Sequence, residues 1–316
     1  MTMAAKKHGR YDAYLEQARN LPPIKTAIVH PCSKEAMVAA IEAWQEKFLQ
    51  PVLVGPELKI RKAAKEAGVK IDDLEIIPTE HSHAAAQTAV EMAASGKVQA
   101  LMKGSLHTDE LLSAVVSSQS GLRTERRISH VYAMDIPAYS KPLLITDAAI
   151  NIRPDLDDKR DIVQNAVDLM RILGREKPLV AVLAAVETVN SKMPATLDAA
   201  ALTVMSMRGQ ITGAVVDGPL AFDNAINLKA AEIKGIVSPV AGKADILLVP
   251  DLEAGNMLAK QLMYFADAGA AGLVLGARVP IILTSRSDKV SVRLASAALA
   301  KIMVERQFKL EKAHHA

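Results

Sequence analysis

Short apolar runs rich in β-branched residues alternate with longer helical patterns along almost the whole chain. Runs such as LVAVLAAV (179–186) and DILLVP (245–250) are continuously apolar, as expected for parallel strands that are covered on both faces. In segments such as 34–48 and 158–173, apolar residues recur every three or four positions, which predicts amphipathic helices. The alternation predicts an α/β fold with mainly parallel sheets.

The predicted elements cover most of the sequence. The expected strands are 27–30, 51–55, 74–78, 99–103, 129–134, 142–146, 179–186, 213–218, 245–250, 272–276 and 279–285. Further helices are expected at 82–95 and 257–267, and a final helix at 289–308. At 316 residues the chain is long for one domain and short for three, so two lobes are expected. The polar stretch NIRPDLDDKR (151–160) marks a place where the chain crosses between them.

Composition and charge narrow the class of protein. Half of the residues are apolar but only 3% are aromatic, so the core must be built from Ala, Val, Leu, Ile and Met. The 38 basic and 35 acidic residues are scattered, so no nucleic-acid partner is expected and any anion site is local. Cys32 is the only cysteine, which excludes an internal disulfide and favours a reducing compartment. The polar N-terminus and the lack of a bilayer-length apolar run predict a cytoplasmic protein without a membrane contact.

Residues that directly follow the apolar runs are the candidates for function, because ligands of parallel α/β proteins bind beyond the carboxyl ends of the strands. After the run 245–250 come Asp251, Gly255 and Asn256. Glycine lets the backbone approach a ligand, and the N–H groups of a following helix start favour an anion. The alternative is an ordinary strand-to-helix turn that uses Gly and Asn for their permissive dihedral angles.

The second candidate group follows the run 279–285. It comprises Thr284, Ser285, Arg286 and Asp288. The arginine fork can grip a phosphate in two places, and neighbouring hydroxyls add hydrogen bonds. The alternative is a capped helix start with the arginine in solvent.

Two further junctions carry positive charge. Lys103 and Gly104 end the run 99–103, where a lysine can meet a phosphate as a point charge; the alternative is a surface lysine before a capped helix. Arg123, Arg126 and Arg127 precede the run 129–134. One of them is expected in an anion pocket, and the alternative is a solvated loop.

The familiar nucleotide and catalytic motifs are absent from the sequence. It contains no phosphate-binding G-x-x-x-x-G-K-[ST] loop and no dinucleotide fingerprint after a strand. It also contains no nucleophile elbow and no H-E-x-x-H pair. No metal is expected.

Three segments together resemble the phosphate acetyltransferase and phosphate butyryltransferase family, from about residue 24 to the C-terminus. These segments are DGPLAFDNAI (217–226), SPVAGKADILLVPDLEAGN (238–256) and TSRSD (284–288). Other segments are more similar to the butyryltransferase branch, namely LMKG (101–104), GLRTERRISHV (121–131), VETVNSKMPATLDAAAL (186–202) and GARVPIILTSRSD (276–288).

The resemblance implies a fold and an activity. The fold has two α/β lobes with a cleft between them, similar to the isocitrate and isopropylmalate dehydrogenases, and the protein is a homodimer. The first lobe is expected at 1–145, rejoined by 277–316, and the second at 146–276. The implied reaction moves a short acyl group, acetyl to butyryl, between CoA and inorganic phosphate. CoA is then a substrate, and no cofactor is bound permanently.

The resemblance also implies roles for the candidate residues. Ser285 and Arg286 match the family's Ser-Arg pair, in which the arginine holds the phosphoryl group, and Thr284 lies beside them. Asp251, Gly255 and Asn256 match the strand end that lines the cleft. For the reaction itself, our hypothesis is that backbone or side-chain donors near Asn256 and Ser285 stabilise the oxyanion.

Two departures from the family pattern change the expected site. The stretch VSVRL (290–294) lacks the acid of the acetyltransferases, which leaves Asp288 as the expected base. The stretch TDELLSAV (108–115) lacks a second family arginine, so Arg123 or Lys103 is expected to supply that charge.

Three alternatives stay open from the sequence. One is a metal-dependent enzyme like the dehydrogenases of this fold, although a nicotinamide fingerprint and metal-binding carboxylates are not evident. Another is a phosphate acyltransferase that acts on acyl carrier protein, which would show a basic docking face. The third is a binding protein without catalysis.

Overall fold

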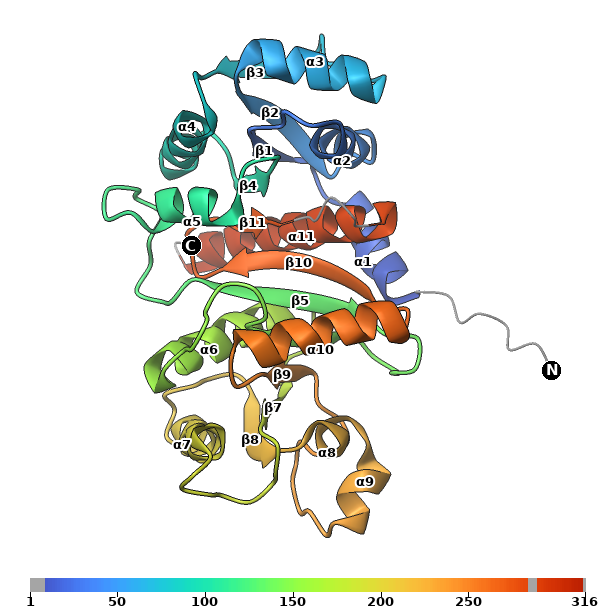
Figure 1. Ribbon diagram of the computed structural model, residues 1–316, viewed down its shortest axis with the longest axis vertical. Coiled ribbons are helices and arrows are strands. Elements are labelled where there is room, and N and C mark those ends of the chain that lie inside the picture. Colours follow the sequence, from blue (N-terminus) through green and yellow to red (C-terminus); the bar gives the residue numbers. More distant parts are fainter. Residues whose placement is uncertain (1–8, 284–288, 315–316) are drawn as a thin grey trace, which may run out of the picture. The chain divides into compact units, whose positions relative to one another are not determined.

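The predicted alternation of strands and helices is present in the computed structural model, which describes residues 9–283 and 289–314 (Figure 1). Contacts group the chain into two units. Unit 1 is built mainly from Arg127–Ala270, and unit 2 from Tyr11–Arg126 together with the segment from Ala271 onward. Each unit is an α/β structure with a mainly parallel sheet, so the predicted fold class is confirmed.

Unit 2 contains the strands in the order β3-β2-β1-β4-β11-β10. They are β1 (Ile24–Val29), β2 (Leu49–Gly55), β3 (Glu75–Pro78), β4 (Ala100–Lys103), β10 (Gly269–Leu275) and β11 (Ile281–Ile282). Its helices are α1 (Gly9–Arg19), α2 (Lys34–Gln45), α3 (Glu57–Ala67), α4 (Ser82–Ala94), α5 (Thr108–Val116) and α11 (Val290–His314).

The order of these strands identifies a place for a ligand in unit 2. The chain runs outward from β1 to β2 and β3, then returns through α4 to place β4 on the other side of β1. Helices α2 and α4 therefore cover opposite faces of this sheet (Figure 1). The reversal makes the carboxyl ends of β1 and β4 a topological switch point, where open α/β sheets bind their ligands.

The long helix α11 is fixed to α2 and the loop that follows it. The Arg293 guanidinium donates to the Glu42 carboxylate at 2.8 Å, with both side chains largely buried. The Lys301 ammonium donates to the Lys47 carbonyl oxygen at 2.8 Å and lies over the Phe48 ring. Arg293 and Lys301 are largely buried charged residues of α11, and these contacts give each of them a polar partner, which offsets the cost of burying the charge.

Unit 1 contains the strands in the order β5-β6-β9-β7-β8. They are β5 (Ser129–Asp135), β6 (Leu143–Thr146), β7 (Leu179–Leu183), β8 (Val215–Leu220) and β9 (Ile246–Leu248). Its helices are α6 (Leu156–Ile172), α7 (Pro194–Met207), α8 (Phe222–Ile226), α9 (Leu228–Ile233) and α10 (Leu252–Phe265). Strand β5 is antiparallel to β6, whereas β6, β9, β7 and β8 run parallel to one another.

One core cluster of unit 1 contains buried residues of its sheet and of α8, α9 and α10. Met134, Ile145, Leu247 and Ala259 are buried there, and small Ala and Val side chains fill much of the remaining space. Aromatic residues are scarce, so few bulky side chains are available to fill this core. The helices and the sheet therefore approach each other closely, and small side chains fill the space between them.

Some predicted boundaries differ from the observed ones. Helix α10 begins at Leu252, five residues before the predicted start at 257, because Asp251 caps it. The lobes are predicted to meet at 145/146 and 276/277, whereas the two units found from contacts meet at 126/127 and 270/271. The predicted lobe limits stay a prediction.

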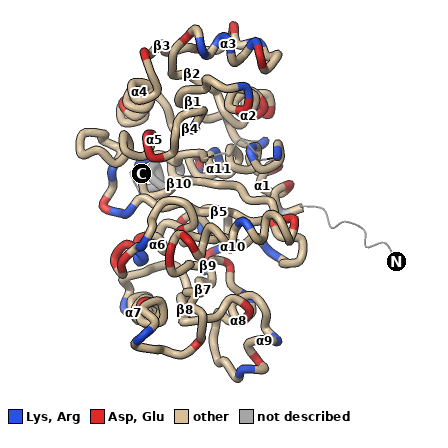
Figure 2. The backbone as a smooth tube through the Cα atoms, viewed as in Figure 1, with Lys and Arg blue, Asp and Glu red and all other residues tan. Residues whose placement is uncertain are grey.

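Basic and acidic side chains are interspersed in both units (Figure 2). Among the described residues, no helix combines the length and the apolar character needed to cross a bilayer.

Candidate active site

The carboxyl ends of β6 and β9 bring three predicted site residues together in unit 1. The Asp251 carboxylate accepts a hydrogen bond from the Ala254 backbone N–H at 2.9 Å and so forms the N-cap of α10. Gly255 lies in the first turn of this helix. A Cβ atom at that position would lie 2.6 Å from the Val249 side chain and 3.0 Å from the Ala148 Cβ. Glycine is thus needed here for close packing of α10 on the strand ends.

Asn256 is oriented by the loop that follows β6. Its Nδ2 atom donates to the Ala148 carbonyl oxygen at 3.2 Å. A side-chain amide carries two N–H donors, so one of them fixes the orientation and the second can serve a substrate oxygen.

The sequence reasoning missed Asp147, which directly follows β6. Its carboxylate is only 2% exposed and accepts hydrogen bonds from the backbone of His130, Ala149, Ile150 and Asn151 and from the Asn151 side chain. The signal that pointed to Asp251, a polar residue directly after a buried strand, is present here as well. From the sequence, the region beyond it is predicted only to be a crossing between lobes.

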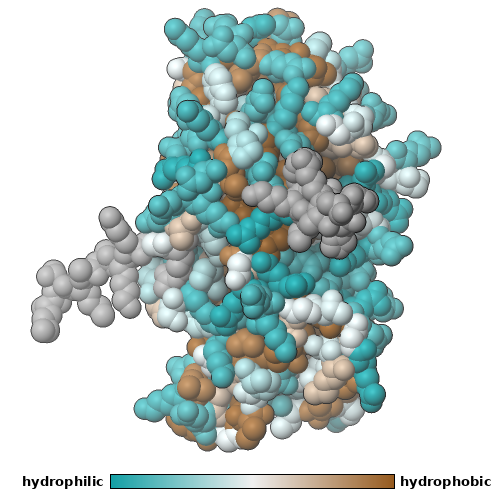
Figure 3. Space-filling model, turned by 180° about the vertical axis from the view of Figure 1, so that it is seen from behind, coloured by the Kyte–Doolittle hydropathy of each residue, from teal (hydrophilic) through white to brown (hydrophobic). Residues whose placement is uncertain are grey.

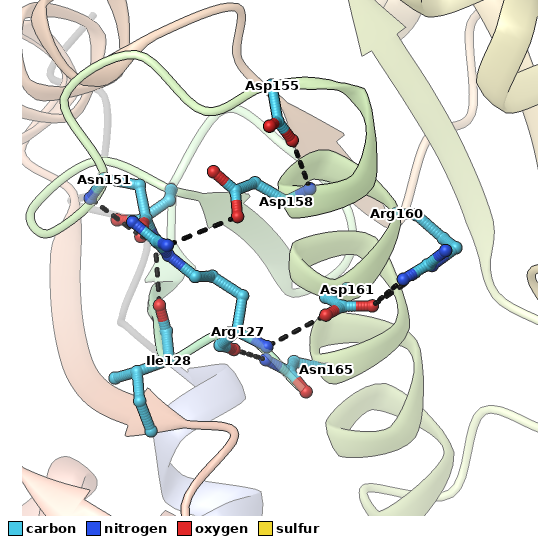
Figure 4. A network of polar contacts seen from close by, with 9 residues as sticks. Arg127, Ile128, Asn151, Asp155, Asp158, Arg160, Asp161 and Asn165 are labelled. Atoms are coloured by element: carbon cyan, nitrogen blue, oxygen red, sulfur yellow. Dashed lines mark hydrogen bonds and ion pairs between the residues drawn. The ribbon is translucent and has the colours of Figure 1, made fainter. Parts of the chain in front are cut away.

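Arg127 belongs to a polar network behind this loop (Figure 4). Its Nε atom donates to Asn151 Oδ1 at 2.8 Å, and its Nη1 atom lies 3.5 Å from the Asp158 carboxylate. The Asn165 amide donates to the Arg127 carbonyl oxygen at 2.9 Å. The Arg127 guanidinium is therefore engaged by contacts within unit 1.

His130 lies at the same edge because antiparallel β5 starts beside the end of β6. The ring packs edge-on against Tyr132 with 4.3 Å between the ring centroids, and its Nδ1 atom has no hydrogen-bond partner among the described residues. Burial lowers the pKa of His130 to about 4, although the Asp147 carboxylate opposes this shift. The imidazole is therefore neutral near pH 7.

In unit 2, Lys103 and Gly104 lie at the switch point formed by β1 and β4. The Gly104 N–H donates to the Val29 carbonyl oxygen at 2.9 Å, and a Cβ at Gly104 would come within 2.6 Å of the His30 carbonyl oxygen. Only glycine fits at this strand end. The Lys103 ammonium is partly buried and donates to the Leu106 carbonyl oxygen at 2.9 Å, so it is already held by the turn that follows β4.

His30 and Ser105, which the sequence reasoning also missed, lie at this edge beside Cys32. Ser105 Oγ donates to the His30 carbonyl oxygen at 2.8 Å and lies 3.1 Å from His30 Nδ1. Burial, aided by the positive charge of Lys59, lowers the pKa of His30. Burial raises the pKa of Cys32 to about 11, which makes its thiol a poor nucleophile.

Of the remaining predicted site residues, the structure describes only Arg123. Arg123 is exposed on a loop of unit 2, where its backbone bridges Ala277. The predicted catalytic residues Ser285, Arg286 and Asp288, with Thr284, lie outside the described residues. Within the described ranges, no three His, Cys, Asp or Glu side chains gather as a metal site would require.

Comparison with known proteins identifies the family. Residues 79–301 match the family model described as "Phosphate acetyl/butaryl transferase". Phosphate acetyltransferase from Rickettsia prowazekii is 61% identical over 290 residues, which are 92% of this chain and 83% of that protein. Phosphate butyryltransferase from Clostridium beijerinckii is 39% identical over 296 residues, which are 94% of this chain and 98% of that protein.

Solved structures support the same conclusion. The branched-chain phosphotransacylase of Enterococcus faecalis superposes with a TM-score of 0.78 at 32% identity, covering 89% of this chain and 99% of that one. The 4-hydroxythreonine-4-phosphate dehydrogenase of Klebsiella pneumoniae has a TM-score of 0.56 at 12% identity, covering 90% and 99%, and shares the fold alone. The predicted likeness to dehydrogenase folds is thereby confirmed. Sequence and structure together show that this chain belongs to the phosphate acetyl/butaryl transferase family.

Proposed function

We propose that this chain is an acyltransferase that moves a short acyl group, acetyl to butyryl, between CoA and inorganic phosphate. Membership of the family is the observation that carries the proposal. The relatives that are 57–61% identical are named for acetyl, whereas those that are 39–43% identical are named for acetyl or for butyryl, so the family names support a range of short acyl groups.

The strand ends of unit 1 supply the chemistry for the acyl carbonyl. Asn256 is held by Ala148 through one N–H of its amide, which leaves the second as a donor to the carbonyl oxygen. Such a donor stabilises the oxyanion that forms during acyl transfer, and losing one typically lowers the rate about a hundredfold to a thousandfold. Asp251 and Gly255 set the start of α10 and thereby the place of Asn256.

The proposed transfer is direct. Asp288 takes the proton of the CoA thiol, and the thiolate sulfur attacks the carbonyl carbon of the acyl phosphate. As the new C–S bond forms, the carbonyl oxygen takes the electron pair of the C=O double bond and becomes the oxyanion that the Asn256 amide stabilises. The carbonyl then re-forms, the bond between the carbonyl carbon and the phosphate oxygen breaks, and phosphate leaves with the electron pair of that bond, held by Arg286 and Ser285. Alignment of the two substrates can contribute roughly 7–11 kcal/mol to the lowering of the barrier.

Unit 2 contributes to substrate binding in this proposal. Lys103, Gly104 and Arg123 supply positive charge and a close backbone approach for phosphate groups, with Thr284 beside the Ser-Arg pair. No permanently bound cofactor is needed, because the acyl phosphate and the thioester are both activated already.

We also propose a homodimer in the cytoplasm. Three apolar side chains of α10 are exposed, namely Met257 at 59%, Tyr264 at 79% and Phe265 at 91%. Met257 and Tyr264 are seven residues apart and lie on the same stripe of the helix, with Phe265 beside it. The face of the molecule drawn in Figure 3 is mostly hydrophilic with smaller hydrophobic patches. A second copy of the chain is the occupant proposed for the α10 stripe.

The function is tested by mixing the purified protein with acetyl phosphate and CoA and measuring acetyl-CoA. We expect one thioester for each acyl phosphate consumed. Acyl transfer to a carrier protein in place of CoA, or reduction of a nicotinamide cofactor, would contradict the proposal and support one of the alternatives from the sequence.

A further inference from the structure

The buried carboxylate of Asp147 is fully used by hydrogen bonds within unit 1. Oδ1 accepts from the Ala149 and Ile150 N–H groups at 2.9 and 3.0 Å. Oδ2 accepts from the His130 and Asn151 N–H groups and from Asn151 Nδ2, the last at 2.6 Å. A carboxylate offers about four lone-pair positions. Asp147 is therefore saturated, and neither proton transfer nor direct substrate binding fits it.

The loop that Asp147 organises is the surface on which α10 begins. The Ala148 carbonyl oxygen accepts the Asn256 amide at 3.2 Å, and the Leu252 N–H donates to the Ile152 carbonyl oxygen at 3.1 Å. Gly255 packs so closely on Ala148 that a Cβ would not fit without movement. The shape of the loop 147–152 thus determines where the Asn256 amide points.

A second layer fixes the same loop from behind. Asn151 is buried, donates to the Ile128 carbonyl oxygen at 2.9 Å and accepts from Arg127 Nε at 2.8 Å. In Figure 4 the Arg127 and Asn151 side chains point toward each other beside the start of α6. Asn151 therefore connects Asp147 to Arg127 and Ile128, the two residues that precede β5, which leaves the loop little freedom to shift.

From these contacts we propose that Asp147 is a positioning residue for catalysis. It fixes the Ala148 carbonyl, and that carbonyl orients the Asn256 amide toward the acyl carbonyl oxygen. The inference rests on the proposed function, in which Asn256 stabilises the oxyanion. An oxyanion donor is effective only when its geometry is set before the reaction, so loss of Asp147 should act on the chemical step through Asn256.

The first test is Asp147→Asn. The substitution keeps the size of the side chain but replaces one carboxylate oxygen with an NH₂ group. In the wild-type protein several N–H groups donate to Oδ2, and an NH₂ group at that position cannot accept their hydrogen bonds. We expect kcat to fall at least about tenfold, with KM for CoA and for acetyl phosphate changing less than about threefold. Asp155→Asn is the matched control, because Asp155 caps α6 by accepting from the Asp158 N–H at 2.9 Å and does not contact the loop 147–152 in any hydrogen bond described here. It should leave kcat unchanged and alter stability only slightly, because Asn caps a helix about as well as Asp.

The second test is a double-mutant cycle with Asn256→Ala. If Asp147 acts through Asn256, the double variant should have nearly the kcat of Asn256→Ala alone. A purely structural role for Asp147 predicts that the two losses multiply. Multiplicative losses, or a normal kcat in Asp147→Asn, would overturn the proposal.

A spectroscopic measurement separates this inference from the proposed function. In ¹⁵N-labelled protein the side-chain amide signal of Asn256, assigned by its loss in Asn256→Ala, should shift in Asp147→Asn and stay in place in Asp155→Asn. An unshifted signal would overturn the positioning role even in an active enzyme. If the signal shifts but the wild-type protein has no transferase activity, the link from Asp147 to the Asn256 amide is retained and the proposed acyl transfer is refuted.

Discussion

Burial at the end of β1 raises the pKa of Cys32 to about 11, so very little of its thiol is ionised near neutral pH. The expected result is slow alkylation by iodoacetamide, with a rate that rises about tenfold per pH unit from about pH 7 to 9 and does not level off. Cys32→Ala should keep the wild-type kcat, because direct transfer needs no enzyme nucleophile. Alkylation that levels off below about pH 9, or loss of activity in Cys32→Ala, would contradict the assignment.

Arg286 is the residue expected to hold the leaving phosphate, although it lies outside the described residues. Arg286→Gln removes the charge and the planar fork, and charged hydrogen bonds to a dianion are strong. We expect kcat to fall about a hundredfold or more in steady-state assays. Arg278→Gln is the control, since exposed Arg278 donates to the Gly121 carbonyl oxygen and has no role in the proposal. Equal rates in the two variants would remove Arg286 from the mechanism.

At the scale of elements, Gly255 shows how closely α10 approaches the ends of β6 and β9. Gly255→Ala would place a methyl group 2.6 Å from the Val249 side chain. We expect a loss of about 1–3 kcal/mol in the free energy of unfolding, measured by urea denaturation. Gly9→Ala is the control, because a Cβ there meets no atom within 4 Å. Equal stability of the two variants would show that the helix can move away without cost.

The elements also show what the sequence could and could not predict. Continuous apolar runs located β7 and β9, because burial on both faces leaves a direct trace in the sequence. The first turn of α10 was interpreted as a loop, since Gly255 and Asn256 are typical of turns. That glycine is needed because a Cβ would meet Val249 and Ala148, and the contact with Ala148 depends on tertiary packing between distant segments. Asp147 was missed because four of its five hydrogen-bond donors are backbone N–H groups, which carry no residue-type signal.

At the scale of the whole molecule, the predicted homodimer places a second copy on the exposed stripe of α10. Tyr264→Glu combined with Phe265→Glu should give a monomer of 33.8 kDa by light scattering, because buried acidic side chains oppose association. Leu58→Glu, an equally exposed apolar position on α3, should leave the dimer intact. A wild-type mass of one chain at high concentration, or a dimer in the double variant, would contradict the prediction.

The measurement that tests the central claim most directly is release of free CoA thiol from acyl-CoA by the wild-type protein, with and without inorganic phosphate. We expect release that depends on phosphate and gives one acyl phosphate per thiol. Between acetyl-CoA and butyryl-CoA, kcat/KM should differ by no more than roughly two hundredfold, the limit set by a few buried methylene groups. Thiol release that is absent, or that proceeds equally without phosphate, would contradict acyl transfer between CoA and phosphate.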